Sequence, residues 1–219
     1  MELRAAIQER HSIRGFLDRP VPRETLEQVL ELASRAVSAQ NTQPWKLCVA
    51  RGEPLDAIRA ETAGRVREGL PLDMDYPPLE GVYRRRNIDV AKQLFGAMDI
   101  AREDRERRDW WTERGFRFFD APVAIILCMD SSLEEAPYRL DLGCLIQNIC
   151  LAAMEYGLGT CVEYQGIAYP DVLRKHLGLS EDLRIACGIA VGYPDPDFPA
   201  NHVVTGREPL ENTVTWHGF

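Results

Sequence analysis

The sequence predicts an α+β protein of three layers, in which helices flank both faces of a mixed central sheet. Residues 122–129 form a continuous apolar run, which is the pattern of a strand covered on both faces. Residues 138–156 form a helix that is apolar almost all round, and such a helix belongs in the centre of a core or in a subunit interface. The 219 residues suffice for one domain with a sizeable core, so we assign residues 1–219 to a single domain.

The chain begins with two predicted helices. Residues 1–10 form a charged amphipathic helix, whose apolar face consists of Leu3, Ala6 and Ile7. Pro22 then stands at the first turn of a second helix. This helix repeats apolar side chains at spacings of three and four, which indicates one buried face. Those side chains are Leu26, Val29, Leu30, Ala33 and Val37.

The next part of the chain alternates regular and irregular segments. Residues 45–50 predict the first strand, and residues 54–70 predict a helix rich in charge. Residues 71–83 contain too much proline and aspartate for regular structure, whereas the apolar repeat of residues 88–98 marks another helix. Because the region 71–119 is irregular, charged and aromatic at once, we expect it to be a variable lid or insertion.

The last third of the chain completes the sheet. Gly157 ends the long helix as a left-handed cap. Residues 160–164 predict a short strand, residues 171–177 a short helix, and residues 183–191 a second buried strand. Residues 194–219 show little periodicity, and an extended tail of this length usually lies on something, often a partner subunit.

The overall composition excludes several classes of protein. A net charge of −8 argues against a nucleic-acid binder, because neutralising phosphates is the main source of that affinity. No apolar run approaches the roughly 18 residues that a bilayer requires, and residues 1–10 are no signal peptide. The six cysteines contain no C-x-x-C pair and the four histidines show no zinc-like spacing, so we expect reduced thiols, no metal site and a cytoplasmic protein.

The most informative residues directly follow the first helix. Arg10, Ser12 and Arg14 alternate at a spacing of two, and guanidinium groups offer a fixed, permanently charged fork to a phosphate. Alternatively, these arginines form a solvated helix end that complements the helix dipole. Asn41 and Gln43 carry amides that can pair with the polar edge of a flat heterocycle, or can serve a turn before a strand. Taken together, the two segments favour a site for flavin mononucleotide.

Other nucleotide-binding motifs are incomplete or absent in this sequence. The glycines Gly157 and Gly159 lack a third partner and lie between a helix and a strand, which is the reverse of the dinucleotide-binding order. The chain has no Walker A sequence, and it has no G-x-S-x-G elbow of an α/β-hydrolase.

Four motifs in order along the chain resemble the FMN-dependent nitroreductase family. They are Arg10-x-Ser12-x-Arg14-x-Phe16, Asn41-x-Gln43-Pro44-Trp45, the helix from Asp141 to Gly159 with Gln147 and Asn148, and Gly188 to Tyr193 with Arg207-x-Pro209-Leu210. The segment from Tyr83 to Phe119 is similar to the nitrobenzoate-reductase branch of this family.

The resemblance implies a nitroreductase-like fold and an intertwined homodimer whose C-terminal extension lies on the partner subunit. It also implies FMN as cofactor, NAD(P)H as electron donor, and ping-pong transfer to a nitroaromatic or quinone-like acceptor. Because the flavin carries the chemistry, no catalytic side chain and no metal are expected. The residues that match the family's cofactor-binding positions are Arg10, His11, Ser12, Arg14, Ser38, Ala39, Gln40, Asn41, Gln43, Gln165, Gly166 and Arg207.

Aromatic residues of the variable region could stack on the acceptor, or could simply fill core. These candidates for substrate binding are Tyr76, Tyr83, Trp110, Trp111 and Phe116. The run Arg84-Arg85-Arg86 could attract a carboxylated nitroaromatic, or could form a solvated helix start. Three alternatives remain within the family, namely reductive dehalogenation, ene reduction and FMN breakdown. From other classes, a non-catalytic flavin-binding protein and a structural protein with coincidental motifs remain. No residue that would select NADH or NADPH can be identified.

Overall fold

The computed structural model describes residues 1–73, 78–133 and 136–219, and it centres on a four-stranded sheet. The strand order is β1 (Trp45–Ala50), β2 (Val123–Asp130), β4 (Leu183–Gly192) and β3 (Gly159–Glu163). All three ladders are antiparallel, with Leu47 opposite Leu127 and Val162 opposite Ile189.

The expected mixed sheet is therefore wrong for the described strands of this chain. A continuous apolar run indicates that a strand is covered on both faces, but it carries no information about the direction of its neighbours. The described chain has one parallel pairing, an isolated bridge between Ser12 and Thr160.

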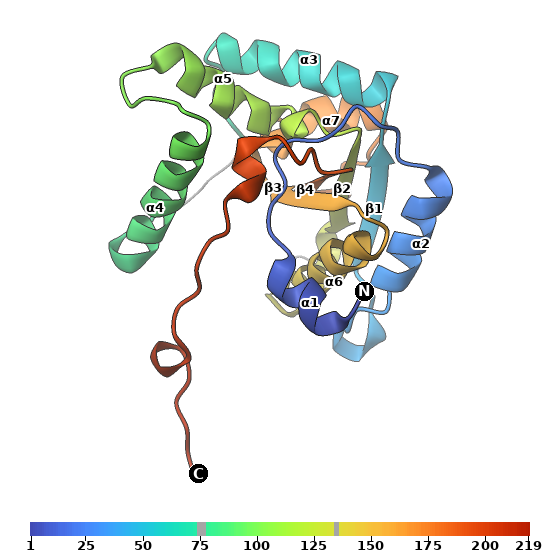
Figure 1. Cartoon of the computed structure of the whole chain (residues 1–219). Coiled ribbons are helices and arrows are strands. Elements are labelled where there is room, and N and C mark those ends of the chain that lie inside the picture. Colours follow the sequence, from blue (N-terminus) through green and yellow to red (C-terminus); the bar gives the residue numbers. More distant parts are fainter. Residues whose placement is uncertain (74–77, 134–135) are drawn as a thin grey trace.

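Helices cover both faces of the sheet (Figure 1). On one face lie α1 (Leu3–Glu9), α2 (Arg23–Ala33) and α6 (Ala136–Glu155), and on the other lie α3 (Glu53–Arg67), α7 (Pro170–Leu177) and α5 (Arg105–Phe116). Helix α4 (Gly81–Ala97) stands beside this second group and projects from the body. The helix–sheet–helix layers that the sequence predicts are thus present.

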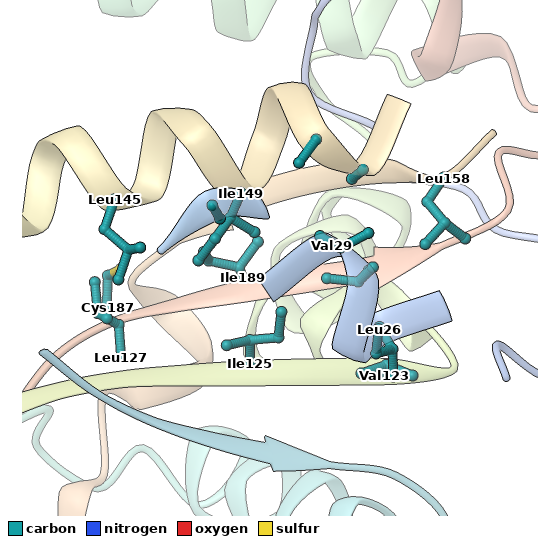
Figure 2. Close-up of a cluster of buried hydrophobic side chains, with 14 of the residues drawn as sticks. Leu26, Val29, Val123, Ile125, Leu127, Leu145, Ile149, Leu158, Cys187 and Ile189 are labelled. Carbon is teal, nitrogen blue, oxygen red and sulfur yellow. The ribbon is translucent and has the colours of Figure 1, made fainter. Parts of the chain in front are cut away.

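Strand β2 supplies both cores because its side chains alternate between the two faces. Figure 2 shows Ile125 and Leu127 beneath α6, whose Leu145 and Ile149 also cover β4. The intervening Ala124, Ile126 and Cys128 pack in the second core, against α3 and α7. Burying a side chain of this size contributes about 1.5–3 kcal/mol, so the apolar run of β2 is a main source of stability.

Several apolar side chains that the sequence assigns to packed helix faces are exposed in the single chain. Leu3 and Ile7 of α1 are more than half exposed, and Leu140 of α6 is 73% exposed. Helix α2 ends at Ala33, so Val37 follows the helix and is 71% exposed. A periodic pattern shows which side chains are suited to burial, but it does not show that the same chain buries them.

The segment between α3 and β2 and the C-terminal tail complete the chain. Residues 78–80 are irregular as expected, residues 74–77 lie outside the described part, and α4 begins at Gly81. The tail after β4 forms a short 3-10 turn at Pro199–His202 and then runs away from the body to the C-terminus (Figure 1).

The sequence predicts no membrane-spanning segment, no disulfide framework and no metal site, and the described residues show the following. Their helices include none with the length and apolarity that crossing a membrane requires. All six cysteines are free thiols. Within the same described ranges, histidine, cysteine and acidic side chains nowhere gather in the groups of three or more that could hold a metal ion.

Candidate functional site

The predicted arginine–serine motif forms an extended strip along the edge of the sheet. Helix α1 ends at Glu9, and Arg10 turns the chain out of the helix with φ −58° and ψ 121°. The strip then runs beside β3, where the Ile13 N–H donates to the Thr160 carbonyl over 2.9 Å. Alternate residues of an extended segment face opposite sides, so Arg10 and Arg14 share one side while Ile13 is buried on the other.

The two guanidinium groups of this strip are half-buried and carry uncompensated charge. Most of the other half-buried arginines, such as Arg59, Arg65 and Arg117, form ion pairs with carboxylates. Among the residues that the structure describes, Arg10 and Arg14 form none. The Nη1 atom of Arg14 donates to the Ser12 carbonyl over 3.4 Å. No acidic side chain of the described residues neutralises the Arg14 guanidinium group. This pair of free cations fits an anion supplied from outside, such as the phosphate of a mononucleotide.

A cavity of about 500 Å³ opens beside Arg14. Its volume lies within the range of about 300–1,000 Å³ that is typical of small-molecule and cofactor sites. One wall is apolar and aromatic and comes from α4, α5 and Phe119, and the opposite wall is the end of β3 with the turn that follows it. The lining residues are Arg14, Asn87, Val90, Ala91, Leu94, Phe95, Trp111, Thr112, Phe119, Cys161, Val162, Glu163, Tyr164 and Gln165.

Trp111 is the central aromatic side chain of this wall. It is buried, with its ring centroid 6.3 Å from that of Phe119 and 6.4 Å from that of Phe198, on which it stacks. Flat aromatic faces of this kind suit a planar ligand. The cavity therefore combines a cation at one end with a surface for a flat ring system.

The turn after β3 is shaped by a buried carboxyl group. The Oε2 atom of Glu163 accepts a 2.8 Å hydrogen bond from the Gly166 N–H, whereas its Oε1 atom is buried without a partner in the described structure. Burial raises the pKa of Glu163 to about 8, although the N–H groups of Gly166 and Gln165 oppose this effect. The N–H of Gly166, a predicted cofactor-binding residue, thus already has an acceptor within its own turn.

Helix α5 approaches this turn closely. A Cβ atom at Gly115 would lie 2.0 Å from Oε1 of Gln165, so a larger residue there would shift the flexible end of the Gln165 side chain, which lines the cavity. The Gln165 side chain in turn donates to the Thr112 carbonyl over 3.5 Å.

The remaining predicted cofactor residues lie elsewhere in the single chain. The segment from Ser38 to Gln43 follows α2 and does not line the cavity, and the Ala39 N–H there is bonded to the carboxylate of Asp141. Arg207 lies in the tail, where its guanidinium group donates to Thr205 and to the Gly206 carbonyl. His11 belongs to the strip, but its ring nitrogens contact the Glu9 and Asn201 carbonyls.

The predicted acceptor-binding aromatic residues divide in the same way. Trp111 lines the cavity, whereas Phe116 is buried and does not line it. Tyr83 and Trp110 are exposed to 64% and 40%, and Tyr76 lies outside the described residues. Arg86 of the arginine run forms an ion pair with Glu208 and lies over the Tyr83 ring.

Sequence reasoning missed three contributors to the site. Val90 and its neighbours on α4 form a cavity wall, which their apolar spacing alone does not distinguish from a core face. Glu163 looks like any acidic residue at a strand end. Asn201 is a buried polar residue in a tail that appeared irregular.

The fold and the site together define a class, namely α+β proteins that bind a flat, anionic cofactor at a sheet edge. The family model described as "Nitroreductase family" matches residues 7–193. The chain therefore belongs to this family. The resemblance stated from the sequence motifs is thus confirmed.

Relatives and solved structures agree with this assignment. The chain is 38% identical to a nitrobenzene nitroreductase of Ectopseudomonas oleovorans, over 96% of this chain and 94% of the relative. It is 34% identical to a 4-nitrobenzoate reductase of Nocardioides sp. (strain LMS-CY), over 97% of this chain and 88% of the relative. The FMN and NADPH-dependent nitroreductase NfnB from Sphigopyxis sp. strain HMH superposes with a TM-score of 0.94 at 32% identity, covering 100% of both chains. The expected nitroreductase-like fold is confirmed.

Proposed function

We propose that this protein is an FMN-dependent NAD(P)H oxidoreductase that reduces nitroaromatic or quinone-like acceptors. The observation that carries the proposal is Arg14, which has no carboxylate partner among the described residues and lines a cavity with an aromatic wall, in the same strip as Arg10. Relatives that align over nearly the whole chain are named for the reduction of nitrobenzene and 4-nitrobenzoate, which supports the same chemistry here.

The residues of the site have separable roles in this proposal. Bound FMN supplies two-electron transfer between NAD(P)H and the acceptor, in ping-pong order. Arg10 and Arg14 hold the phosphate and the ribityl chain by charge-assisted hydrogen bonds, which are about twice as strong as neutral ones. Trp111 and Phe119 exclude water and offer a stacking face to the planar rings. The Gln165 side chain borders the same space and orients what binds there.

We also propose that the site is completed in a homodimer. The residues from Ser38 to Gln43 do not line the cavity of their own chain, so they reach a cofactor only across an interface. Apolar residues of α1, α2 and α6 leave an open groove of about 520 Å³ that includes Leu3, Leu32 and Leu151. The C-terminal tail, which carries Arg207, runs away from the body of its own chain (Figure 1). The free thiols agree with a reducing compartment, and we place the protein in the cytoplasm.

An absorbance spectrum of the purified protein, followed by anaerobic titration, tests this proposal. We expect flavin absorbance that is bleached by NADH or NADPH and restored by nitrobenzene or 4-nitrobenzoate. Arg14→Ala should lose bound flavin, whereas Arg23→Ala should keep it, because Arg23 is exposed and pairs only with Glu27 on its own helix. A colourless protein that cannot be reconstituted with FMN would overturn the proposal.

A further inference from the structure

We propose that Asn201 is a positioning residue for cofactor recognition, because its buried side chain fixes the backbone from which Arg14 extends into the cavity. This inference rests on the proposed flavin function and adds a residue outside the motifs that point to it. Asn201 lies in the 3-10 turn Pro199–His202, where the tail leaves the body of the protein.

All four hydrogen-bonding positions of the Asn201 amide are used. Its Oδ1 atom accepts from the N–H groups of Arg14 over 2.7 Å and of Gly15 over 3.1 Å. Its Nδ2 atom donates to the carbonyls of Gly15 over 2.8 Å and of Asp195 over 2.9 Å. An amide can make two bonds of each kind, so the side chain is saturated, and three of its four bonds hold residues 14 and 15.

The main chain of Asn201 adds a further contact to the same strip. Its carbonyl lies 2.8 Å from Nε2 of His11, at the beginning of the strip. Between these two contacts, the Ile13 N–H is bonded to Thr160 of β3. Polar contacts therefore hold the extended strip at its start, its middle and its end.

This arrangement links the strip to the aromatic wall as well. A Cβ atom at Gly15 would lie 2.0 Å from Cγ of Phe198, so the tail packs directly on the strip. Phe198 stacks on Trp111, and Arg114, which lies over the Phe198 ring, donates to the Arg14 carbonyl over 2.9 Å. A substitution of Asn201 therefore acts directly on the backbone of Arg14 and only indirectly on the aromatic wall.

The direction of the Arg14 side chain depends on these bonds. Successive side chains of an extended segment point to opposite sides, so a rotation of the unfastened backbone would turn a guanidinium group away from its partner. Removing the amide also leaves two buried N–H groups and two carbonyls without partners, and the backbone would move to satisfy them. We therefore expect the effect on cofactor binding to act through the Arg14 side chain.

The test compares Asn201→Asp with and without the Arg14 side chain. Asn201→Asp keeps the shape and one acceptor oxygen, but it places a second oxygen against the carbonyls of Gly15 and Asp195. We expect the Kd for FMN to rise about tenfold or more, as for the loss of one charge-assisted contact, and to rise less than about threefold further when Asn201→Asp is added to Arg14→Ala, because Asn201 acts through Arg14. His202→Ala is the matched control, because His202 is the exposed neighbour in the same turn.

The outcomes are distinguishable. If Asn201→Asp binds FMN as the unaltered protein does, or weakens binding by the same factor with and without the Arg14 side chain, the positioning role is refuted and the proposed function stands. If the unaltered protein does not bind FMN, the proposed function fails and this inference fails with it. If the variant does not fold, amide hydrogen exchange of the unaltered protein decides: the Arg14 and Gly15 amides should exchange slowly before FMN is added, and rapid exchange there would refute the inference.

Discussion

Replacing Glu163 by glutamine should change how the stability of this protein depends on pH. The carboxyl group is buried, and the glycines at positions 166 and 188 leave it the space that it occupies, since a Cβ atom there would lie 2.5 Å and 3.1 Å from Oε1. Glutamine has nearly the same shape and keeps an acceptor for the Gly166 N–H. Unlike glutamate, it cannot ionise.

The sign and the size follow from the pKa of Glu163. Burial raises that pKa from an ordinary value of 4.5 to about 8. Between these two values the unfolded chain has lost a proton that the folded chain keeps, so the free energy of unfolding falls as the pH rises. Each pH unit corresponds to about 1.4 kcal/mol, which gives at most about 5 kcal/mol over the whole window.

Urea denaturation at fixed protein concentration between pH 5 and pH 8.5 measures this effect. Near pH 5 the two proteins should be similarly stable, and the advantage of Glu163→Gln should grow by about 1.4 kcal/mol per pH unit up to about pH 8. Glu113→Gln is the control, because Arg67 lowers the pKa of Glu113 and its contribution to stability is lost only in acid. Parallel pH dependence of the unaltered protein and Glu163→Gln would refute the reasoning.

Three further changes have defined outcomes. Arg207→Ala should weaken FMN binding about tenfold or more in a fluorescence titration, because one charge-assisted phosphate contact is lost; unchanged affinity would remove Arg207 from the phosphate site. Gly115→Ala should change the free energy of unfolding by less than about 1 kcal/mol in urea, because the added methyl group meets the flexible end of Gln165 at 2.0 Å and alanine favours the helix; a loss of several kcal/mol would show that Gln165 cannot move aside. Lys175 lowers the pKa of Glu61 from 4.5 to about 2, so the stabilisation from the ionised carboxylate is lost as the pH falls through this range. Thermal melting should therefore show that the gap between the unaltered protein and Glu61→Gln narrows from pH 7 to pH 3, and a constant gap would argue against the ion-pair cluster.

Much of the fold was predictable because it is encoded locally. The apolar run of β2 and the all-round apolar face of α6 each describe their own surroundings, and both lie in the cores as expected. Strand direction depends on distant partners, so the antiparallel ladders were not predictable from these runs. The exposure of Leu3 and Leu140 was not predictable for a similar reason. Their periodic positions indicate side chains suited to burial, but the single chain does not bury them. The assignment of all residues to one domain stays a prediction.

The site was predictable where a motif concentrates unusual chemistry in a short stretch. Arg10 and Arg14 are uncommon neighbours for a helix end, and they indeed lie on one side of a strip without carboxylate partners. Glu163 and Asn201 are single polar residues whose importance comes from burial and from partners far along the chain. Such a residue looks ordinary in the sequence, because its hydrogen bonds are defined only once the tail has folded back onto residues 14 and 15.

The outer edge of β3 has a consequence for handling the protein. The strip bonds to this edge at Thr160, and beyond it, from Cys161 to Glu163, the described chain adds no further strand. This part of the edge faces the cavity instead of another strand, and an unpaired strand edge that becomes accessible is a template on which other chains assemble. We therefore expect preparations depleted of flavin to aggregate sooner during concentration and storage, and riboflavin or FMN added during expression to improve the yield of dispersed protein.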